Sequence, residues 1–495
     1  MTWAKAARSS RVGTALGTLA TFVFLCVPLL SSQEPTPQTG TTTSPAQTGT
    51  SAPSVQMVRP GEPGGTAAPA TITLADALER ARQNNADYLS AVTDARSAHD
   101  DRIQARASLL PSVTASTQEL LTTGNGIRGE GRYVTNDGVH VYRGWGIFHQ
   151  DLSPNFWTMT GYHRAGAAEA VAKAKLEIAS RGLVVTVTKA YYDLAVAQRK
   201  YATAQQALDQ TKHFFSITQQ QEQAGQAAHS DVIKSQLQVE QQQQAFDQAQ
   251  LVMENARLAL AVLIFPSLNE NFTVVDDLDK APALPSFADA QNMVARSNPG
   301  LRVAMESLRE ANLDVSAARN AMLPSVTLDT DLGIEANAFA FTSRVSADPL
   351  AGCPEKPTPA SCGRLPNFGQ FTTATLNVPV FDWGSLRSKF HQAHLKQQLA
   401  QAQLSLTQRE LLGNLYSYYN GAAVAQAAVE SLRRSADLAA ESLRLNTLRY
   451  QSGEATVLEV VDAQTTLTAA RNAYDDGQES YRVAITTLQT LTGSF

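Results

Sequence analysis

The chain contains two copies of one large unit, and this duplication limits the folds open to it. Residues Leu109–Thr114 read LLPSVT, and residues Met322–Thr327 read MLPSVT. The same offset aligns Leu74–Ala77 with Phe287–Ala290. A repeat of this length is too long for the stacked units of a solenoid. We therefore expect two similar halves, related by a pseudo-twofold or placed side by side around an axis.

The N-terminal region has the composition of a targeting segment followed by a leader. Basic residues come first, and an apolar run then ends at Ser31-Ser32, which indicates a secretory signal peptide over residues 1–32 rather than a membrane anchor. Residues 33–72 are rich in Thr, Pro, Gly, Ser and Gln and have hardly an aliphatic side chain. Such a segment cannot bury enough surface to offset chain ordering, so we expect a disordered leader there.

Charge and cysteine content narrow the remaining possibilities. The net charge of −5 does not favour a nucleic-acid partner. No segment after the signal peptide is apolar and long enough for a transmembrane helix, so any membrane passage must use strands. Cys353 and Cys362 flank a proline-rich stretch, and in an exported loop we expect them to form a disulfide. The alternative is two unrelated surface cysteines.

Each copy carries the pattern of a long helical hairpin. Residues 157–223 lack proline, and their apolar residues recur every three or four positions. The recurring residues are Leu183, Val187, Ala190, Leu194, Ala197, Tyr201, Ala204 and Leu208. Copy two repeats the seam with Leu395, Leu399, Ala402 and Leu406, and later with Val429, Leu432, Ala436, Ala439 and Leu443. A glycine interrupts each helix, Gly225 and Gly453, before helical sequence resumes toward Leu263 and Leu491. Periodicity alone leaves an ordinary coiled coil as the alternative.

Between the helices the period changes to two. Pro111 and Pro324 end the incoming helices. After Pro324, residues 326–340 alternate apolar and polar, and residues 372–380 do the same on a return strand. Copy one has a matching pair near 113–121 and 139–148. This alternation, with carboxylates on the water-facing side, is typical of a membrane-barrel strand. A soluble hairpin with one solvent-exposed face gives a similar pattern.

The number of strands in one chain limits how these hairpins could form a barrel. Four strands cannot close a barrel, so closure requires other chains, and twelve strands from a trimer would leave an open lumen.

Trp145, Phe148, Phe156 and Trp157 gather near the end of the second strand. They fit an aromatic girdle at a membrane interface. Ordinary packing at a strand-to-helix junction fits them equally well.

From Leu74 to Gly493 the chain resembles the TolC-like outer membrane efflux proteins of Gram-negative bacteria. The resemblance lies in the duplicated Leu-Pro-Ser-Val exit, in VPVFDWG at 378–384, and in Gly453 followed by VLEVVDAQ at 457–464. It implies a mainly α fold in which duplicated helical hairpins form a trimeric α-barrel. Four strands per chain would add a 12-stranded transmembrane β-barrel. We expect repeats at 73–265 and 286–495, with an inter-repeat linker at 266–285.

The same resemblance implies a function. The chain would be the outer membrane channel of a tripartite efflux or type I secretion system, a passive exit duct whose helical part lies in the periplasm. Its implied partners are two further copies, a periplasmic adaptor protein and an inner-membrane pump of the RND, ABC or MFS type. The alternative from another class is a secreted or periplasmic coiled-coil scaffold without a channel.

The resemblance also assigns roles to residues near the glycine breaks. Gly225 and Gly453 match the tips that dock the adaptor. Glu459 and Asp462 match the entrance carboxylates, which three copies would arrange as a ring that favours cations; solvated helix-face acids are the alternative. Asp231 and Tyr450 match two members of a polar link that closes the entrance. Ala455 stands where the family has an arginine.

The chain shows no enzyme signature. The histidines are scattered, and we find no phosphate loop, no metal-ligand spacing and no nucleophile in a catalytic setting. We therefore expect no enzymatic activity, no cofactor and no metal.

Overall fold

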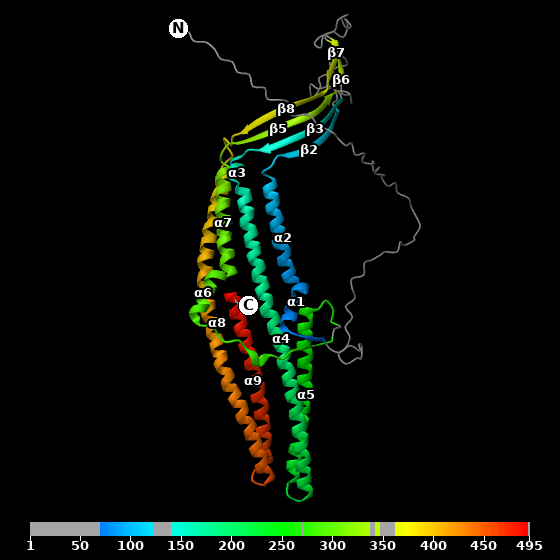
Figure 1. Ribbon diagram of the computed structural model, residues 1–495, viewed down its shortest axis with the longest axis vertical. Helices are drawn as coiled ribbons and strands as arrows, with labels where there is room; N and C mark the ends of the chain where they lie inside the picture. Colours follow the sequence, from blue (N-terminus) through cyan, green and yellow to red (C-terminus); the bar gives the residue numbers. More distant parts are fainter. Residues whose placement is uncertain (1–69, 122–139, 269–270, 337–341, 347–361, 494–495) are drawn as a thin grey trace, which may run out of the picture. The chain divides into compact units, whose positions relative to one another are not determined.

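The computed structural model describes residues 70–121, 140–268, 271–336, 342–346 and 362–493 (Figure 1). The expected signal peptide and most of the expected leader lie outside these ranges. The leader was expected to extend to residue 72, and here the prediction is wrong. Ala70–Ile72 forms β1, which pairs in parallel with Phe272–Val274 (β4), and Ile72 is buried. The burial of that side chain holds β1 against the inter-repeat linker.

The described helices fall into two matching series. The first series is α1 (Leu74–Asn84), α2 (Ala86–Ala107), α3 (Pro154–Trp157), α4 (Thr160–Gln223) and α5 (His229–Ile264). The second is α6 (Phe287–Ser297), α7 (Pro299–Asn320), α8 (Ser385–Gln451) and α9 (Val457–Thr492), with a 3₁₀ turn at Leu278–Lys280 between the series. None of the described helices combines the length and the apolarity that crossing a membrane requires.

The duplication extends to the helix caps. Thr73 caps α1 by accepting from the backbone N–H of Asp76, and Ser286 caps α6 in the same way. Asn85 and Asn298 cap α2 and α7 through their side-chain oxygens. Each such cap satisfies a backbone donor that the helix itself cannot pair, which contributes about 1 kcal/mol. The two copies therefore start their helices by the same local chemistry.

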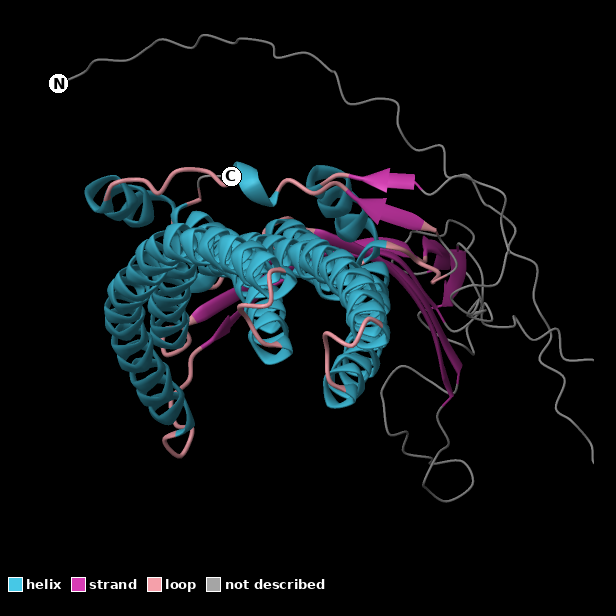
Figure 2. Cartoon of the chain, turned by 90° about the horizontal axis from the view of Figure 1, so that it is seen from below, coloured by secondary structure: helices cyan, strands magenta, loops and turns pink. Residues whose placement is uncertain are grey.

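The long helices run alongside one another, and both hairpin turns lie at the same end (Figures 1 and 2). Along α4 the predicted seam is confirmed, because Leu183, Val187 and Leu194 are buried. In α8 the two parts of the predicted seam differ. In the later part Ala439 is buried and Leu443 packs against the tips, as predicted. In the earlier part Leu395 and Leu399 are exposed, and the residues buried there include Ala393 and Ala400, so the periodicity located an apolar face that stays exposed in a single chain.

An ion-pair cluster fixes α2 against α4. The buried carboxylate of Glu169 contacts Lys173 Nζ (2.5 Å), Arg102 Nη1 (2.9 Å) and His99 Nδ1 (3.0 Å). Lys173 and then Arg102 lower the pKa of Glu169 to about 2. Arg102 also donates to Tyr162 Oη at 2.9 Å. Because the cations come from both helices, the pair α2/α4 is joined by charge as well as by packing.

Four antiparallel strands form one sheet in the order β2-β3-β5-β8. The strands are β2 (Ser112–Leu121), β3 (His140–Asp151), β5 (Ser325–Ala336) and β8 (Phe368–Asn377), and a separate pair joins β6 (Thr342–Ser346) to β7 (Cys362–Pro366). The predicted return strand at 372–380 is misplaced, since the ladder ends where Asn377 pairs with Ser325. Cys353 lies outside the described residues, so the expected disulfide with Cys362 stays a prediction.

The sheet has one mostly polar face and one mostly apolar face. Directly opposed residues share a face, and successive residues alternate between faces. The register groups these polar-face residues: Ser112, Thr114, Arg143, His149, Thr327, Asp329, Asp331, Glu335, Thr373 and Thr375. It groups these apolar-face residues: Val113, Phe148, Val326, Leu328, Leu332, Ile334, Phe368, Ala374 and Leu376. This division is the alternation that the sequence predicted.

Candidate functional site

The long helices α4 and α8 end in the same backbone turn at the two hairpin tips. At the end of α4 the backbone N–H of Gly225 donates to Glu222 O, and that of Gln226 donates to Gln221 O, both at 2.8 Å. The end of α8 repeats the pattern through Gly453 and Glu454. The two glycines have φ of 73° and 80°, a left-handed conformation that favours glycine. The residues predicted as tips therefore are the turning points of both hairpins.

An apolar cluster joins the two tips within the chain. Phe214 from α4 lies 5.0 Å, centroid to centroid, from the ring of Tyr450 at the end of α8. Val457 and Val460 at the start of α9 complete the buried cluster, and Ala455 packs against it. Ala455, which replaces the arginine expected from the family, thus contributes apolar surface instead of a polar link.

Tyr450 and Asp231 line one groove of about 620 Å³ between the tips. Tyr450 is 7% exposed, and its buried Oη has no hydrogen-bond partner among the described residues. The nearest charged contact of Asp231 is Lys234 Nζ at 3.6 Å. The structure therefore brings the two predicted gate residues to one groove, but without the predicted hydrogen bond between them in this chain.

The two predicted entrance carboxylates have different surroundings. Glu459 forms a capping box with Thr456 at the start of α9, and its Oε2 lies 3.3 Å from Arg449 Nη1. Asp462, one turn further, is exposed. The cap and the ion pair give Glu459 a structural role, whereas the geometry leaves Asp462 available to solvent and solutes. The sequence analysis did not predict a role for Arg449, which pairs with Glu459 at this tip.

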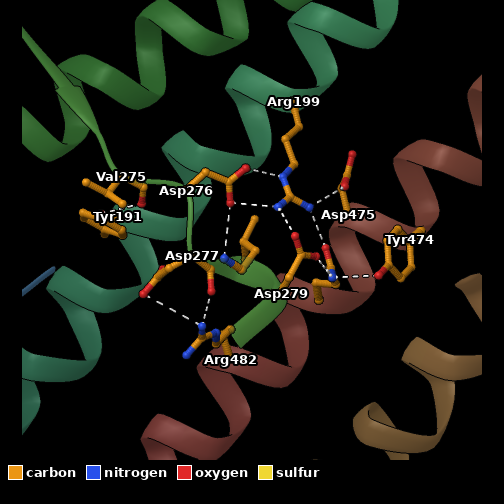
Figure 3. Close-up of polar contacts among 11 residues, drawn as sticks. Tyr191, Arg199, Val275, Asp276, Asp277, Asp279, Tyr474, Asp475 and Arg482 are labelled. Atoms are coloured by element: carbon orange, nitrogen blue, oxygen red, sulfur yellow. Dashed lines mark hydrogen bonds and ion pairs between the residues drawn. The ribbon is translucent and has the colours of Figure 1, made fainter. Parts of the chain in front are cut away.

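A larger polar cluster, which we call the linker clamp, fastens the inter-repeat linker to α4 and α9 (Figure 3). It consists of Arg199, Asp276, Asp279, Asp475 and Gln478. Arg199 contacts Asp276 (2.5 Å), Asp279 (3.2 Å), Asp475 (3.3 Å) and Gln478 (2.7 Å), and Gln478 in turn donates to Asp279 (2.7 Å). One guanidinium therefore holds together three segments of the chain.

In the linker clamp, burial and the neighbouring polar groups shift the pKa values of the charged residues in opposite directions. Burial alone would lower the pKa of Arg199, but the facing carboxylates raise it above its ordinary value. Hydrogen bonding from Gln478 lowers the pKa of Asp279, whereas burial raises the pKa of Asp475. Asp475 is the buried carboxylate of the cluster, so it depends most on the cation beside it.

Nearer the strands, a second group of charged residues lies between α4 and α9. Lys189 Nζ contacts Asp193 Oδ1 at 2.8 Å and lies 3.9 Å from Glu479 Oε1. Burial and the facing carboxylate of Asp193 raise the pKa of Glu479 to about 8. Glu479 is thus held in its protonated form at a pH where an exposed glutamate is ionised.

We expect Glu479→Gln to flatten the dependence of stability on pH. The folded pKa of Glu479 is above its ordinary 4.5, so its contribution is complete below about pH 4.5 and is lost as pH rises through about 8. Thermal melting of the detergent-solubilised protein between about pH 6 and about pH 9 should show a falling midpoint for the wild type and a smaller fall for the variant. Exposed Glu441, which Arg444 keeps ionised in that range, supplies the control Glu441→Gln. Equal slopes for wild type and Glu479→Gln would contradict the assignment.

The arrangement of duplicated helical hairpins and a four-stranded sheet is similar to that of solved outer membrane channels. The structure of Campylobacter jejuni CmeC aligns with a TM-score of 0.69 at 19% identity over 85% of each chain. The open-state structure of Neisseria gonorrhoeae MtrE aligns with a TM-score of 0.68 at 21% identity, covering 85% of this chain and 88% of that one. These likenesses establish the fold.

Sequence comparison identifies the family. Nodulation protein T of Rhizobium leguminosarum bv. trifolii is 23% identical over 413 residues, which cover 80% of this chain and 79% of that protein. Outer membrane protein OprJ of Pseudomonas aeruginosa is 26% identical over 340 residues, covering 65% and 62%. The outer membrane efflux protein family model matches residues 77–264 and 291–494. The chain belongs to the outer membrane efflux protein family.

Proposed function

We propose that this chain is the outer membrane exit duct of a tripartite efflux or type I secretion system. Three copies pool their strands into a twelve-stranded barrel in the outer membrane, and their helices continue it as a tunnel in the periplasm. A periplasmic adaptor and an inner-membrane pump of the RND, ABC or MFS type deliver the substrate and the energy. The duct itself is passive and carries out no chemistry.

The observation that carries this proposal is the four-stranded sheet. Its outer strands, β2 and β8, each pair on one side only among the described strands. Unpaired edges are unfavourable in lipid, because no water is there to satisfy the backbone groups. The apolar face suits lipid and the polar face suits a water-filled lumen. Copies that pair β2 with β8 would remove both edges and keep each face in its proper solvent.

The helices support assembly of several copies. Large apolar side chains lie exposed on α8, among them Leu395, Leu399 and Leu406, and on α5, among them Ile233 and Leu237. Extended apolar surface of this kind marks an interface. Neighbouring copies in the tunnel would cover these faces, which explains why the earlier part of the predicted α8 seam is exposed in one chain.

Exposed aromatic residues shortly before α4 and α8 support the position of the membrane. Phe156 and Trp157 precede α4, and Phe381 and Trp383 precede α8; each pair of rings meets edge to face. Trp157 is 70% and Trp383 is 90% exposed. Packing within the chain therefore does not account for them. Amphipathic rings of this kind prefer the boundary between lipid and water, here at the periplasmic end of the strands.

At the opposite end, the tips around Gly225 and Gly453 would dock the adaptor. Of the two proposed entrance carboxylates, Asp462 is better placed to face the lumen, since Glu459 is engaged by Thr456 and Arg449. Three copies of Asp462, with Glu459 nearby, would form a ring that favours cations. Substituting Asp462→Asn should reduce cation selectivity more than Glu459→Gln does.

The proposal is tested on the full-length protein in outer membrane extracts. A heat-labile trimer in detergent that forms ion-conducting pores in planar bilayers is the expected result. A monomer released from membranes by salt alone, without pore activity, would support the scaffold alternative and overturn the duct. Affinity capture from intact membranes would then show which adaptor accompanies the trimer.

The proposed entrance latch leads to a prediction of its own. Asp231→Ala combined with Tyr450→Phe should raise single-channel conductance, because both residues line the groove between the tips. The phenol oxygen, unpaired within the chain, would bond a carboxylate when neighbouring hairpins close the entrance, and the double variant removes both groups. The conservative change Tyr450→Phe keeps the packing on Phe214. Lys234→Ala, on the same helix face as Asp231, serves as a control. Unchanged conductance in the double variant would remove this pair from the latch.

A further inference from the structure

On the polar face of the sheet, one carboxylate differs from its neighbours. β5 presents Asp329, Asp331 and Glu335 on this face. Glu335 lies 2.8 Å from Arg143 Nη2, and Asp329 lies 2.5 Å from His149 Nδ1, each directly across on β3. The residues directly opposite Asp331 are instead apolar, Ile147 on β3 and Phe371 on β8.

Asp331 is therefore the one of these three carboxylates that has no basic residue directly across from it on a neighbouring described strand. Its side chain makes no ion pair or hydrogen bond with the residues that the structure describes. A sheet pairs charges across strands where it can, because such pairs stabilise it. A carboxylate left between two apolar neighbours is accordingly free to meet a cation that is not part of this chain.

Two aromatic rings lie beside this carboxylate. Trp145 on β3 and Phe371 on β8 meet across β5 with centroids 5.3 Å apart and an interplanar angle of 84°. Their approach is possible because Gly333, directly opposite Trp145, contributes no side chain. Phe371 is 49% exposed. Cation attraction to ring faces and apolar contact with ring edges are both available here.

The sheet next to the rings is also open. Gly369 lies directly opposite Gly333, and a Cβ added at Gly369 would meet no atom within 4 Å. Rings, carboxylate and bare backbone thus adjoin on one face. This combination suits a solute with a flat apolar part and a positive charge.

We propose that Trp145, Phe371 and Asp331 form a contact site for aromatic organic cations. The inference rests on the proposed function, since solutes reach this face only if it lines the duct. The rings contact the flat part of the solute, and Asp331 neutralises its charge and disfavours anions. Three copies would place three such sites around the lumen, each weak enough for the solute to leave.

The test uses the full-length protein in planar bilayers with ethidium as the probe. Ethidium should cause transient current blocks, and Asp331→Asn or Trp145→Leu should shorten them about tenfold, the scale of one partly desolvated cation–π or charge contact. Asp329→Asn removes the same charge from the same face of β5 and should leave the blocks unchanged. Tetraethylammonium, which has no ring, and 1-pyrenesulfonate, an aromatic anion, should block briefly or not at all.

The outcomes separate this inference from the proposed function. If the wild type forms no pores, the duct itself fails. If pores form but ethidium blocks are as long in Asp331→Asn as in wild type, or are shortened equally by Asp329→Asn, the contact site is wrong and the duct stands. Trp145→Phe, which keeps a ring, should retain long blocks; if Trp145→Leu does not assemble, Phe371→Leu replaces it.

Discussion

Substituting Gly333→Ala should prevent assembly of the channel. A Cβ added at this position would lie 1.9 Å from the carbonyl oxygen of Gly144 and 2.9 Å from the Cα of Trp145. Both contacts are with backbone of β3, so no side-chain rotation relieves them. Overpacking ordinarily costs about 1–3 kcal/mol, and forcing two paired strands apart costs more. We expect the heat-labile oligomer in membrane extracts to fall by about tenfold or more, since each 1.4 kcal/mol is a factor of about ten.

The control for this substitution lies on the neighbouring strand. Gly369 is directly opposite Gly333, and an added Cβ there would meet nothing within 4 Å. Gly369→Ala should therefore assemble as the wild type does. Similar oligomer yields for the two alanine variants would show that β3 and β5 are not as close as described.

Most of the fold could be predicted because its signals are local. Gly225 and Gly453 end long proline-free helices, and a turn with positive φ is what glycine at such a position provides. The strands followed from alternation alone. Their ends did not: the pattern continues through Val378 and Val380, but Pro379 has no N–H to donate to a ladder, and pairing stops at Asn377.

Partners were harder to predict than elements. Helical periodicity identified an apolar face on α8 without showing that the face lacks a neighbour in its own chain. The linker clamp was missed because Arg199 finds its partners between 77 and 279 residues away, a pairing that no local pattern records. The acidic run at Asp276, Asp277 and Asp279 was its one visible signal.

At the start of α9, the sequence contains a capping signal as well as the residues that match the family. Thr456 followed three residues later by Glu459 is the pattern of a capping box, and the structure contains that box. The family resemblance assigned Glu459 to the entrance ring on position alone. The local chemistry of α9 gives it a second role, which weakens its part in the ring and leaves Asp462 as the stronger candidate.

Substituting Arg199→Met should strongly destabilise the protein. The Arg199 side chain is 22% exposed, and its guanidinium neutralises Asp276, Asp279 and the buried Asp475. Removing one partner of a buried ion pair costs about 3–5 kcal/mol, because the remaining charge stays away from water. We expect a lower midpoint of thermal unfolding in detergent. The exposed pair Arg444–Glu441 supplies the matched control Arg444→Met, which should leave the midpoint close to that of the wild type.

A second substitution distinguishes loss of charge balance from loss of packing. Asp276 and Asp279 are more exposed than Asp475 and can regain water when Arg199 is removed, so the cost should arise mainly at Asp475. Adding Asp475→Asn to Arg199→Met should therefore restore part of the lost stability. Burial already raises the pKa of Asp475, and without the arginine that pKa should rise further, so the deficit of Arg199→Met should shrink as pH falls. A deficit that neither Asp475→Asn nor acid reduces would mean that Arg199 acts through packing, and that the inter-repeat linker is held to α4 and α9 by its apolar contacts alone.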